Sequence, residues 1–208
     1  GAVVDRIPDA TTRGTAKAGL SGQGQGGRQK NAHTSRQSQS VIDSYIALGS
    51  NLQDPAIQLQ RAVSALSTLP DSSLSQVSAV YASHAVGPGK QPDYLNAVAR
   101  LATTLGPETL LDQLQQLELR QGRTREQRWA ARTLDLDILL YGELQLHTDR
   151  LTIPHPAMAD RNFVVFPLAD LCGPNFVLPD GTELGTLLRD CPRGELRQTG
   201  LQLQGHAP

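Results

Sequence analysis

The chain has 208 residues, a length that suits one domain with a tail. Its 19 Lys and Arg residues and 20 Asp and Glu residues give a formal net charge of −1, which argues against a nucleic-acid partner because phosphate-tracking surfaces make a domain basic. No apolar run is long enough to cross a membrane. The two cysteines, Cys172 and Cys191, lack the spacing of a metal site, so we expect a reduced, cytoplasmic protein.

The N-terminal segment differs in composition from the rest of the chain. The hydrophobic content of 38% is low for a packed protein, and the deficit lies in residues 1–40, which contain no aromatic residue. Such a segment cannot bury enough apolar area to offset its chain entropy. We therefore predict a disordered tail over 1–40, a folded domain over 41–180 and a C-terminal extension over 181–208. The sequence leaves open whether the tail is an expression remnant, a linker or the stub of a fusion.

Regular patterns begin near residue 44. Residues 44–48 predict a short strand, and Asp54 followed by Pro55 predicts a helix N-cap and first turn, with the helix ending near Pro70. Further strands are expected over 74–82, 94–105 and about 132–142, and a second helix is expected from 106. A hairpin-like segment (143–153), a turn (154–156), an apolar run (163–171) and a weakly patterned tail (176–208) follow.

This element order predicts a fold class. Strand–helix–strand–strand–helix–strand is the ferredoxin-like βαββαβ unit, an α+β fold with an antiparallel sheet and its helices on one face. The opposite face of the sheet is then available for a ligand.

Two aspartates mark that face. Asp135 and Asp137 lie two apart in the apolar strand, so both project from one side while Leu136 and Ile138 project from the other. Two neighbouring carboxylates on a mostly buried strand repel each other, and a hard cation such as Mg²⁺ resolves the conflict. The alternative is an exposed edge strand with two solvated aspartates.

An arginine-rich segment precedes the pair. It contains Arg120, Arg123, Arg125, Arg128 and Arg132, with Trp129 among them. Guanidinium groups match phosphate oxygens, so arginines followed by a metal-type carboxylate pair suggest a polyphosphate held for phosphoryl transfer. A solvated basic loop is the bland alternative.

Together these motifs resemble those of a known family, the 6-hydroxymethyl-7,8-dihydropterin pyrophosphokinases of folate biosynthesis. The resemblance runs from about Tyr45 to about Pro179. Its segments are Ala47-Leu-Gly-Ser-Asn51, Gln91-Pro-Asp-Tyr-Leu-Asn96, Glu118 to Arg123, Arg132 to Leu139, and Leu151-Thr-Ile-Pro-His155 followed by Arg161-x-Phe163. His84 and Pro156 depart from the residues that are common at their positions.

The resemblance implies a reaction and a catalytic set. Pyrophosphate would pass from MgATP, the co-substrate, to the pterin hydroxymethyl group with release of AMP. Asp135 and Asp137 would hold two Mg²⁺ ions, and Arg123 and Arg132 would stabilise the transferring phosphates. No residue is an obvious general base, so the metal would activate the hydroxyl.

The remaining site residues are also implied by the resemblance. Those expected to bind ATP are Gln115, Glu118, Arg125, Arg128, Trp129, Thr152, His155 and Arg161, with Arg125, Arg128 and Trp129 on a loop that closes over the site. Those expected to bind the pterin are Ser83, Val86, Tyr94, Asn96 and Phe163, with Tyr94 and Phe163 stacking on its two faces.

Two other readings compete with this one. A nucleotide-sugar glycosyltransferase also uses Asp-x-Asp with a divalent metal, but it usually needs a larger nucleotide-binding domain. A ferredoxin-like binding module without activity is the non-enzymatic alternative, and the intact Asp135, Asp137, Arg123 and Arg132 set argues against it. We expect a monomer that acts on small molecules, without a nucleic-acid or membrane partner.

Overall fold

The computed structural model describes residues 40–85, 92–122 and 133–205. Residues 1–39 of the predicted tail, Val86, and the arginine segment 123–132 with Trp129 lie outside these residues. The elements are β1 (Ile42–Ser50), α1 (Pro55–Ser67), β2 (Ser72–Val77), β3 (Tyr81–Ser83), β4 (Tyr94–Thr103), α2 (Pro107–Arg120), β5 (Asp135–Tyr141), β6 (Leu146–His147), β7 (Thr152–Ile153), α3 (Asn162–Cys172), α4 (Leu184–Asp190) and β8 (Arg197–Gln198).

The main sheet has the strand order β5-β1-β4-β3-β8. β2 and β3 pair with successive parts of β4. All of its pairings are antiparallel. If β2 and β3 are counted as one interrupted strand, the order from β1 to β5 is βαββαβ. The predicted ferredoxin-like fold is confirmed.

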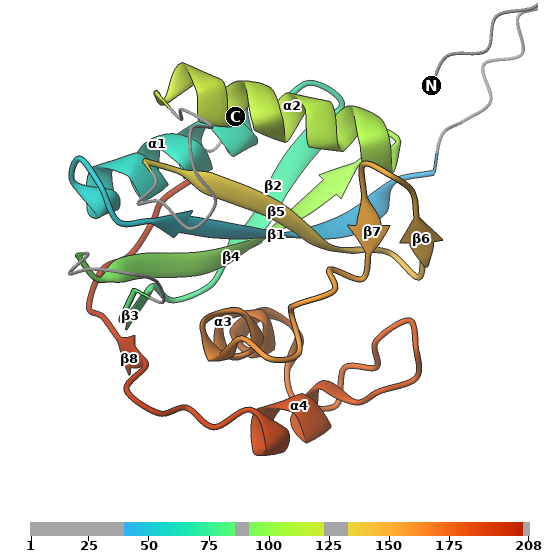
Figure 1. The fold of residues 1–208 in the computed structure, drawn as a ribbon. Coiled ribbons are helices and arrows are strands. Elements are labelled where there is room, and N and C mark those ends of the chain that lie inside the picture. Colours follow the sequence, from blue (N-terminus) through green and yellow to red (C-terminus); the bar gives the residue numbers. More distant parts are fainter. Residues whose placement is uncertain (1–39, 86–91, 123–132, 206–208) are drawn as a thin grey trace, which may run out of the picture. The chain divides into compact units, whose positions relative to one another are not determined.

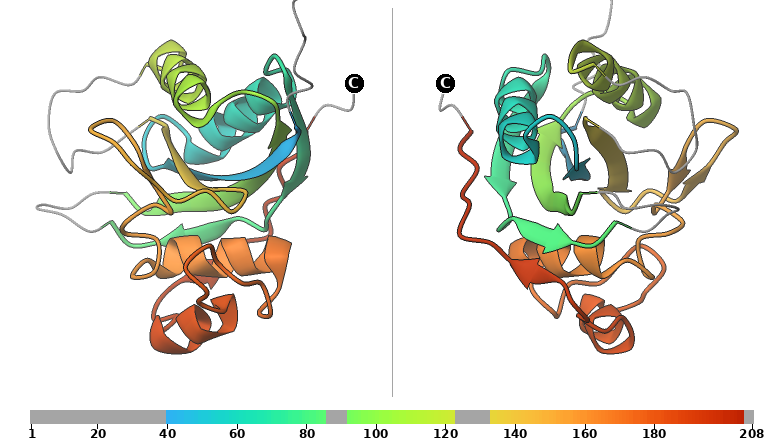
Figure 2. Two further views of the ribbon diagram at one scale, coloured as in Figure 1. Left: turned by 90° about the vertical axis from the view of Figure 1, so that its right-hand side faces the viewer. Right: turned by 60° about the vertical axis from the view of Figure 1, so that its left-hand side comes forward.

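Two apolar layers cover the sheet (Figures 1 and 2). Helices α1 and α2 pack on one face, where the leucines of both helices meet the inward side chains of β1, β4 and β5. Helix α3 packs against β4 and β3 on the other face, with α4 beneath it. The predicted pair of helices on one face is therefore present, and the C-terminal helices occupy part of the face that the sequence pattern left open.

Local sequence explains where α1 begins. Asp54 is its N-cap, with φ of 62°, and its carboxylate accepts a hydrogen bond from the Ile57 N–H at 3.4 Å. Pro55 fits the first turn because that position needs no N–H donor. The helix then buries one stripe that includes Leu59 and Leu66, both fully buried.

One predicted strand is wrong in detail. Residues 74–82 form two strands, because the chain leaves the sheet edge between Val77 and Tyr81. Ser78 makes the break: its N–H donates to the Val98 carbonyl and its hydroxyl oxygen accepts from the Val98 N–H, each at 2.9 Å. The Ser78 hydroxyl therefore takes the place of a backbone carbonyl as acceptor for the Val98 N–H, and β3 then pairs with the first residues of β4.

The C-terminal residues also differ from their weak sequence pattern. β8 pairs with β3 and extends the sheet, and Leu184 and Leu196 are buried. Beyond β8 the chain runs along the sheet edge to α1, where the Gln60 side chain donates to the Gln204 carbonyl and accepts from its N–H (Figure 2). None of the described helices is long and apolar enough to cross a membrane.

Candidate active site

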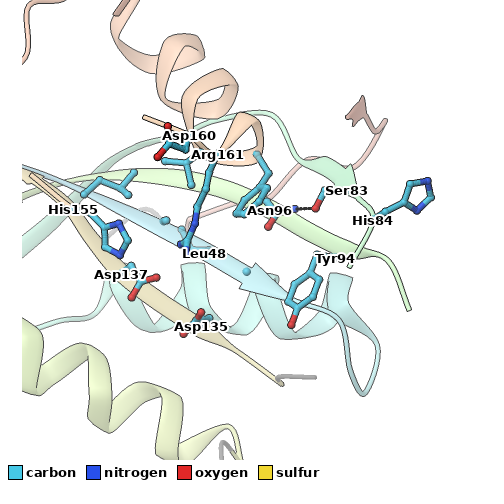
Figure 3. A pocket seen from close by; sticks show the side chains of 15 residues that line it. Leu48, Ser83, His84, Tyr94, Asn96, Asp135, Asp137, His155, Asp160 and Arg161 are labelled. Atoms are coloured by element: carbon cyan, nitrogen blue, oxygen red, sulfur yellow. Dashed lines mark hydrogen bonds between the residues drawn. The ribbon is translucent and has the colours of Figure 1, made fainter. Parts of the chain in front are cut away.

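A cavity of about 440 Å³ opens on the sheet face that α3 only partly covers. Its floor comes from β1, β4 and β5, and its walls come from β3 and from the segment that leads into α3 (Figure 3). The lining residues are Ala47, Leu48, Gly49, Ser83, His84, Tyr94, Asn96, Asp135, Asp137, Leu139, His155, Asp160, Arg161, Phe163 and Val164.

The aspartate pair faces this cavity. Asp135 and Asp137 both line it, whereas Leu136 and Ile138 are buried in the core under α1 and α2. The alternation expected for the strand is therefore confirmed. The two carboxylates lie next to each other along β5 in Figure 3.

The sheet register arranges polar groups in a row across the floor. Asn96 of β4 pairs with Gly49 of β1, and Gly49 pairs with Asp135 of β5. Two strand spacings separate Asn96 from Asp135, which is about 10 Å. A Cβ on Gly49 would lie 3.6 Å from Asn96 Oδ1 and 4.0 Å from Asp135 Cβ, so the missing side chain leaves the floor open between them.

Two neighbouring segments hold β5, which ends the sheet order. The Leu136 N–H donates to Glu118 Oε1 of α2 at 2.8 Å, and Glu118 is only 2% exposed. The His155 N–H donates to the Leu139 carbonyl at 2.9 Å. Because Leu136 lies between the two aspartates, the bond to Glu118 fixes the backbone that carries both.

His155 is a neutral imidazole in this arrangement. The Ala157 N–H donates to its Nδ1 at 3.2 Å, so that nitrogen is unprotonated and Nε2 carries the hydrogen. Burial is the largest effect and lowers the pKa of His155. Asp137, the next largest, raises it, Arg161 lowers it, and Asp135 raises it less. The ring lies beside Asp137 in Figure 3.

Arg161 brings a positive charge to the opposite wall. Its side chain extends into the cavity above the sheet in Figure 3, and its guanidinium carbon lies 5.9 Å from the centroid of the Phe163 ring. Cationic and aromatic groups thus meet where the chain enters α3. The wall at the start of α3 therefore carries a guanidinium group, an aromatic ring and the Asp160 carboxylate, and β5 carries Asp135 and Asp137.

The β3 and β4 wall presents an amide and a phenol. The Asn96 side-chain N–H donates to Ser83 Oγ at 2.9 Å and to the Tyr81 carbonyl at 3.4 Å, which fixes the amide orientation (Figure 3). Ser83 and Tyr94 are partners at the end of the β3–β4 ladder. Both line the cavity, so the predicted pterin contacts within the described residues share one site with the aspartate pair.

Helix α3 is anchored to β3 behind this wall. The Tyr81 hydroxyl donates to both carboxylate oxygens of Asp170 at 3.1 Å. Burial, followed by the effect of Asp170, raises the pKa of Tyr81 to about 12, and burial raises the pKa of the Asp170 carboxyl above its usual range.

Some expected residues lie elsewhere. Among the described residues, Gln115 and Glu118 are on α2 and Thr152 is on β7, away from the cavity lining. Arg123, Arg125, Arg128, Trp129, Arg132 and Val86 lie outside the described residues. Their roles stay predictions.

Several lining residues carried no predicted role. Ala47 and Gly49 lie in the floor, and two small residues at alternate positions of a strand were the available signal. Asp160 and His84 could not be found from sequence, because each joins the site only through tertiary packing.

Asp135 and Asp137 are the oxygen donors that a metal ion in this cavity would meet on β5. Within the described part of the chain, no group of three or more His, Cys, Asp and Glu side chains could hold a metal. Mg²⁺ is commonly held by one or two carboxylates plus substrate phosphates and waters, so Asp135 and Asp137 fit that mode.

Comparison with known proteins gives one family. A sequence model of the family described as 7,8-dihydro-6-hydroxymethylpterin-pyrophosphokinase matches residues 45–173. A Pseudomonas aeruginosa protein named 2-amino-4-hydroxy-6-hydroxymethyldihydropteridine pyrophosphokinase is 53% identical over 148 residues, which cover 71% of this chain and 91% of the relative. A Haemophilus influenzae protein of the same name is 48% identical over 149 residues, covering 72% and 92%.

Solved structures agree at the level of the fold. A crystal structure of Plasmodium falciparum HPPK-DHPS with pterin and p-hydroxybenzoate has a TM-score of 0.56 at 12% identity. The match covers 74% of this chain and 44% of the solved one, so the chain spans less than half of that protein.

Proposed function

Because the chain belongs to the 7,8-dihydro-6-hydroxymethylpterin-pyrophosphokinase family, we propose that the cavity beside Asp135 and Asp137 is its active site. The reaction is transfer of pyrophosphate from ATP to the hydroxymethyl group of 6-hydroxymethyl-7,8-dihydropterin, a step of folate biosynthesis. The observation that carries the assignment is that both carboxylates open into one cavity with Asn96, Tyr94 and Phe163.

The chemistry determines which groups must meet. The hydroxymethyl oxygen forms a bond to the β-phosphorus of ATP, the bond from that phosphorus to the α–β bridging oxygen breaks, and AMP leaves with this oxygen. The hydroxyl proton is lost to solvent. The protein therefore has to align two substrates and neutralise phosphate charge, which are the main contributions to phosphoryl transfer.

Mg²⁺ bound at Asp135 and Asp137 would supply charge neutralisation and lower the pKa of the substrate hydroxyl. Arg161, on the opposite wall, offers a fixed cation for phosphate oxygens. His155, neutral and with Nε2–H available, is a hydrogen-bond donor rather than a base toward the same oxygens.

The register suggests how the pterin lies. A flat bicyclic ring placed over Gly49 would span from the Asn96 amide toward Asp135, with Tyr94 and Phe163 available for its faces. Its hydroxymethyl arm would then reach the carboxylates. The Asn96 amide nitrogen donates to Ser83 Oγ and to the Tyr81 carbonyl, so its Oδ1 is the acceptor presented to the polar edge of the ring.

The test is product identification with a matched variant. The chain, ATP, Mg²⁺ and the reduced pterin should yield AMP and the pterin pyrophosphate, measured by chromatography. Asp137→Asn should lower kcat by about a hundredfold or more, because a lost metal contact removes several kcal/mol of transition-state stabilisation. Asp149→Asn, on an exposed residue, should retain full activity. Near-normal turnover by Asp137→Asn would refute the assignment.

The expected cytoplasmic location, the monomeric state and the second Mg²⁺ ion remain predictions. The same holds for the catalytic roles of Arg123 and Arg132.

A further inference from the structure

The C-terminal residues 192–199, here called the brace, contact both walls of the cavity. They follow α4 and include β8, which pairs with β3 so that Tyr81 opposes Gln198 and Ala82 opposes Arg197. We propose that the brace sets the spacing of the two walls and is thereby a positioning element for the heteroaromatic substrate. This inference rests on the proposed function.

One end of the brace is held at the start of α3. The Asn162 side chain donates to the carbonyl oxygens of Pro192 at 3.2 Å and Arg193 at 2.9 Å. Asn162 lies between Arg161 and Phe163, which both line the cavity. A shift of the brace would therefore move the start of α3, and with it Arg161 and Phe163.

Arg193 fastens the brace to the layer beneath. Its guanidinium carbon lies 5.9 Å from the Tyr81 ring centroid and 5.6 Å from that of Phe166, so it contacts one ring on β3 and one on α3. Its Nε donates to the Leu196 carbonyl at 3.2 Å, and Leu196 is 4% exposed. These contacts give the brace a defined conformation.

The other end of the brace is held by two polar side chains of the β3–β4 wall, His84 and Asp93. Arg197 lies 3.3 Å from Asp93, and Glu195 lies 3.2 Å from His84 Nε2. His84 Nδ1 is 2.7 Å from Asp93, so the four side chains, together with the backbone from Glu195 to Arg197, form a closed ring. His84 follows Ser83, and Asp93 precedes Tyr94, so the ring joins the brace to both strands that carry pterin contacts.

The exposure of these side chains indicates which contacts stabilise the brace and which position the wall. The four side chains of the ring are 40% to 83% exposed, so each pair contributes little to stability in water. The brace is held on the domain by Leu196, Arg193 and the pairing of β8 with β3. The ring of four side chains fixes the position of the β3–β4 wall relative to the brace. Loss of the ring should therefore alter ligand affinity more than it alters the folding of the chain.

The experiment measures dissociation constants for the pterin and for a non-hydrolysable ATP analogue by calorimetry, together with the melting temperature. The double variant Glu195→Ala with Arg197→Ala should weaken pterin binding by about threefold to tenfold, because the wall that carries Ser83 and Tyr94 is then no longer held by these contacts. Affinity for the ATP analogue should not change. Glu195→Gln with Arg197→Lys, which keeps polar side chains at both positions and a donor toward Asp93, should restore part of the loss.

Asn162→Ala tests the other end and should weaken pterin binding in the same way. Gln60→Ala is the matched control, because it releases the C-terminal segment at Gln204, beyond the brace, and should leave pterin binding unchanged.

Two results would refute the proposed role of the brace. One is a pterin affinity within twofold of wild type in both the double variant and Asn162→Ala. The other is a loss of pterin affinity in Gln60→Ala as large as in those variants. Failure of the wild-type chain to bind the pterin would instead overturn the proposed function, and the brace with it.

Discussion

Truncation of Glu118 tests whether α2 holds the aspartate strand. Glu118 is buried, and its carboxylate accepts the Leu136 N–H at 2.8 Å between Asp135 and Asp137. Glu118→Ala leaves that N–H buried at the sheet edge. Glu118→Gln keeps an oxygen acceptor in the same place and removes the charge.

The size of the effect follows from this contact. A hydrogen bond to a charged group contributes about 1.5–3 kcal/mol, and its loss leaves the donor without compensation by water. For a domain of this size each kcal/mol shifts Tm by about 2–4 °C, so Glu118→Ala should melt about 3–12 °C below wild type. Glu118→Gln should lose less than half as much, because its amide oxygen can still accept the Leu136 N–H.

Thermal unfolding followed by circular dichroism measures both variants, with Leu119→Ala as control because that neighbouring side chain is 51% exposed. Activity adds a second readout: displacement of the Leu136 backbone moves both carboxylates, so kcat should fall in Glu118→Ala even below its melting transition. If Glu118→Ala melts within about 1 °C of wild type, the contact does not hold the strand.

Three further predictions concern the floor, a helix end and a buried carboxyl. Gly49→Ala should keep or raise Tm, because Ala is favoured over Gly by about 0.5–1 kcal/mol within a strand. It should weaken pterin binding, since the new methyl group enters the cavity floor. Calorimetry measures the affinity, with Gly200→Ala as control, and an unchanged affinity would contradict the placement of the pterin over Gly49. Asp54→Ala should lower the free energy of unfolding by about 0.5–2 kcal/mol and Asp54→Gly by only a few tenths, measured by urea titration; equal losses would show that the cap is not the cause. Asp170 has a raised folded-state pKa, so its contribution to stability is fully present below the ordinary aspartate pKa and is lost as pH rises through the folded-state value. Asp170→Asn keeps an acceptor for Tyr81, so its Tm should exceed that of wild type near pH 7 and the difference should shrink toward about pH 4; a difference that does not vary with pH refutes the burial argument.

The sequence allowed the fold to be predicted where a local rule governs. Asp54 with Pro55 marked the start of α1, and strand alternation predicted that Asp135 and Asp137 share a face. The break at Ser78 was not predictable, because it depends on hydrogen bonds with Val98 on another strand.

The candidate site divides in the same way. Family motifs named eight of the residues that line the cavity: Ser83, Tyr94, Asn96, Asp135, Asp137, His155, Arg161 and Phe163. No local pattern could place Glu118 on the Leu136 N–H, or bring the C-terminal tail beside β3, because such contacts arise only when distant segments pack.

The position of β5 at the end of the sheet order has a consequence for synthesis of the chain. β5 is the last of the strands between residues 42 and 141, and its sheet partner is β1, the first of them. A growing chain can therefore pair β1 with β4 before Asp135 and Asp137 of β5 have left the ribosome. Until β5 arrives, one edge of β1 is open, and open edges invite pairing with other chains. Long-range pairing is slow to form, so we expect interrupted chains that end before β5 to aggregate. Turnover would then report that translation has passed β5.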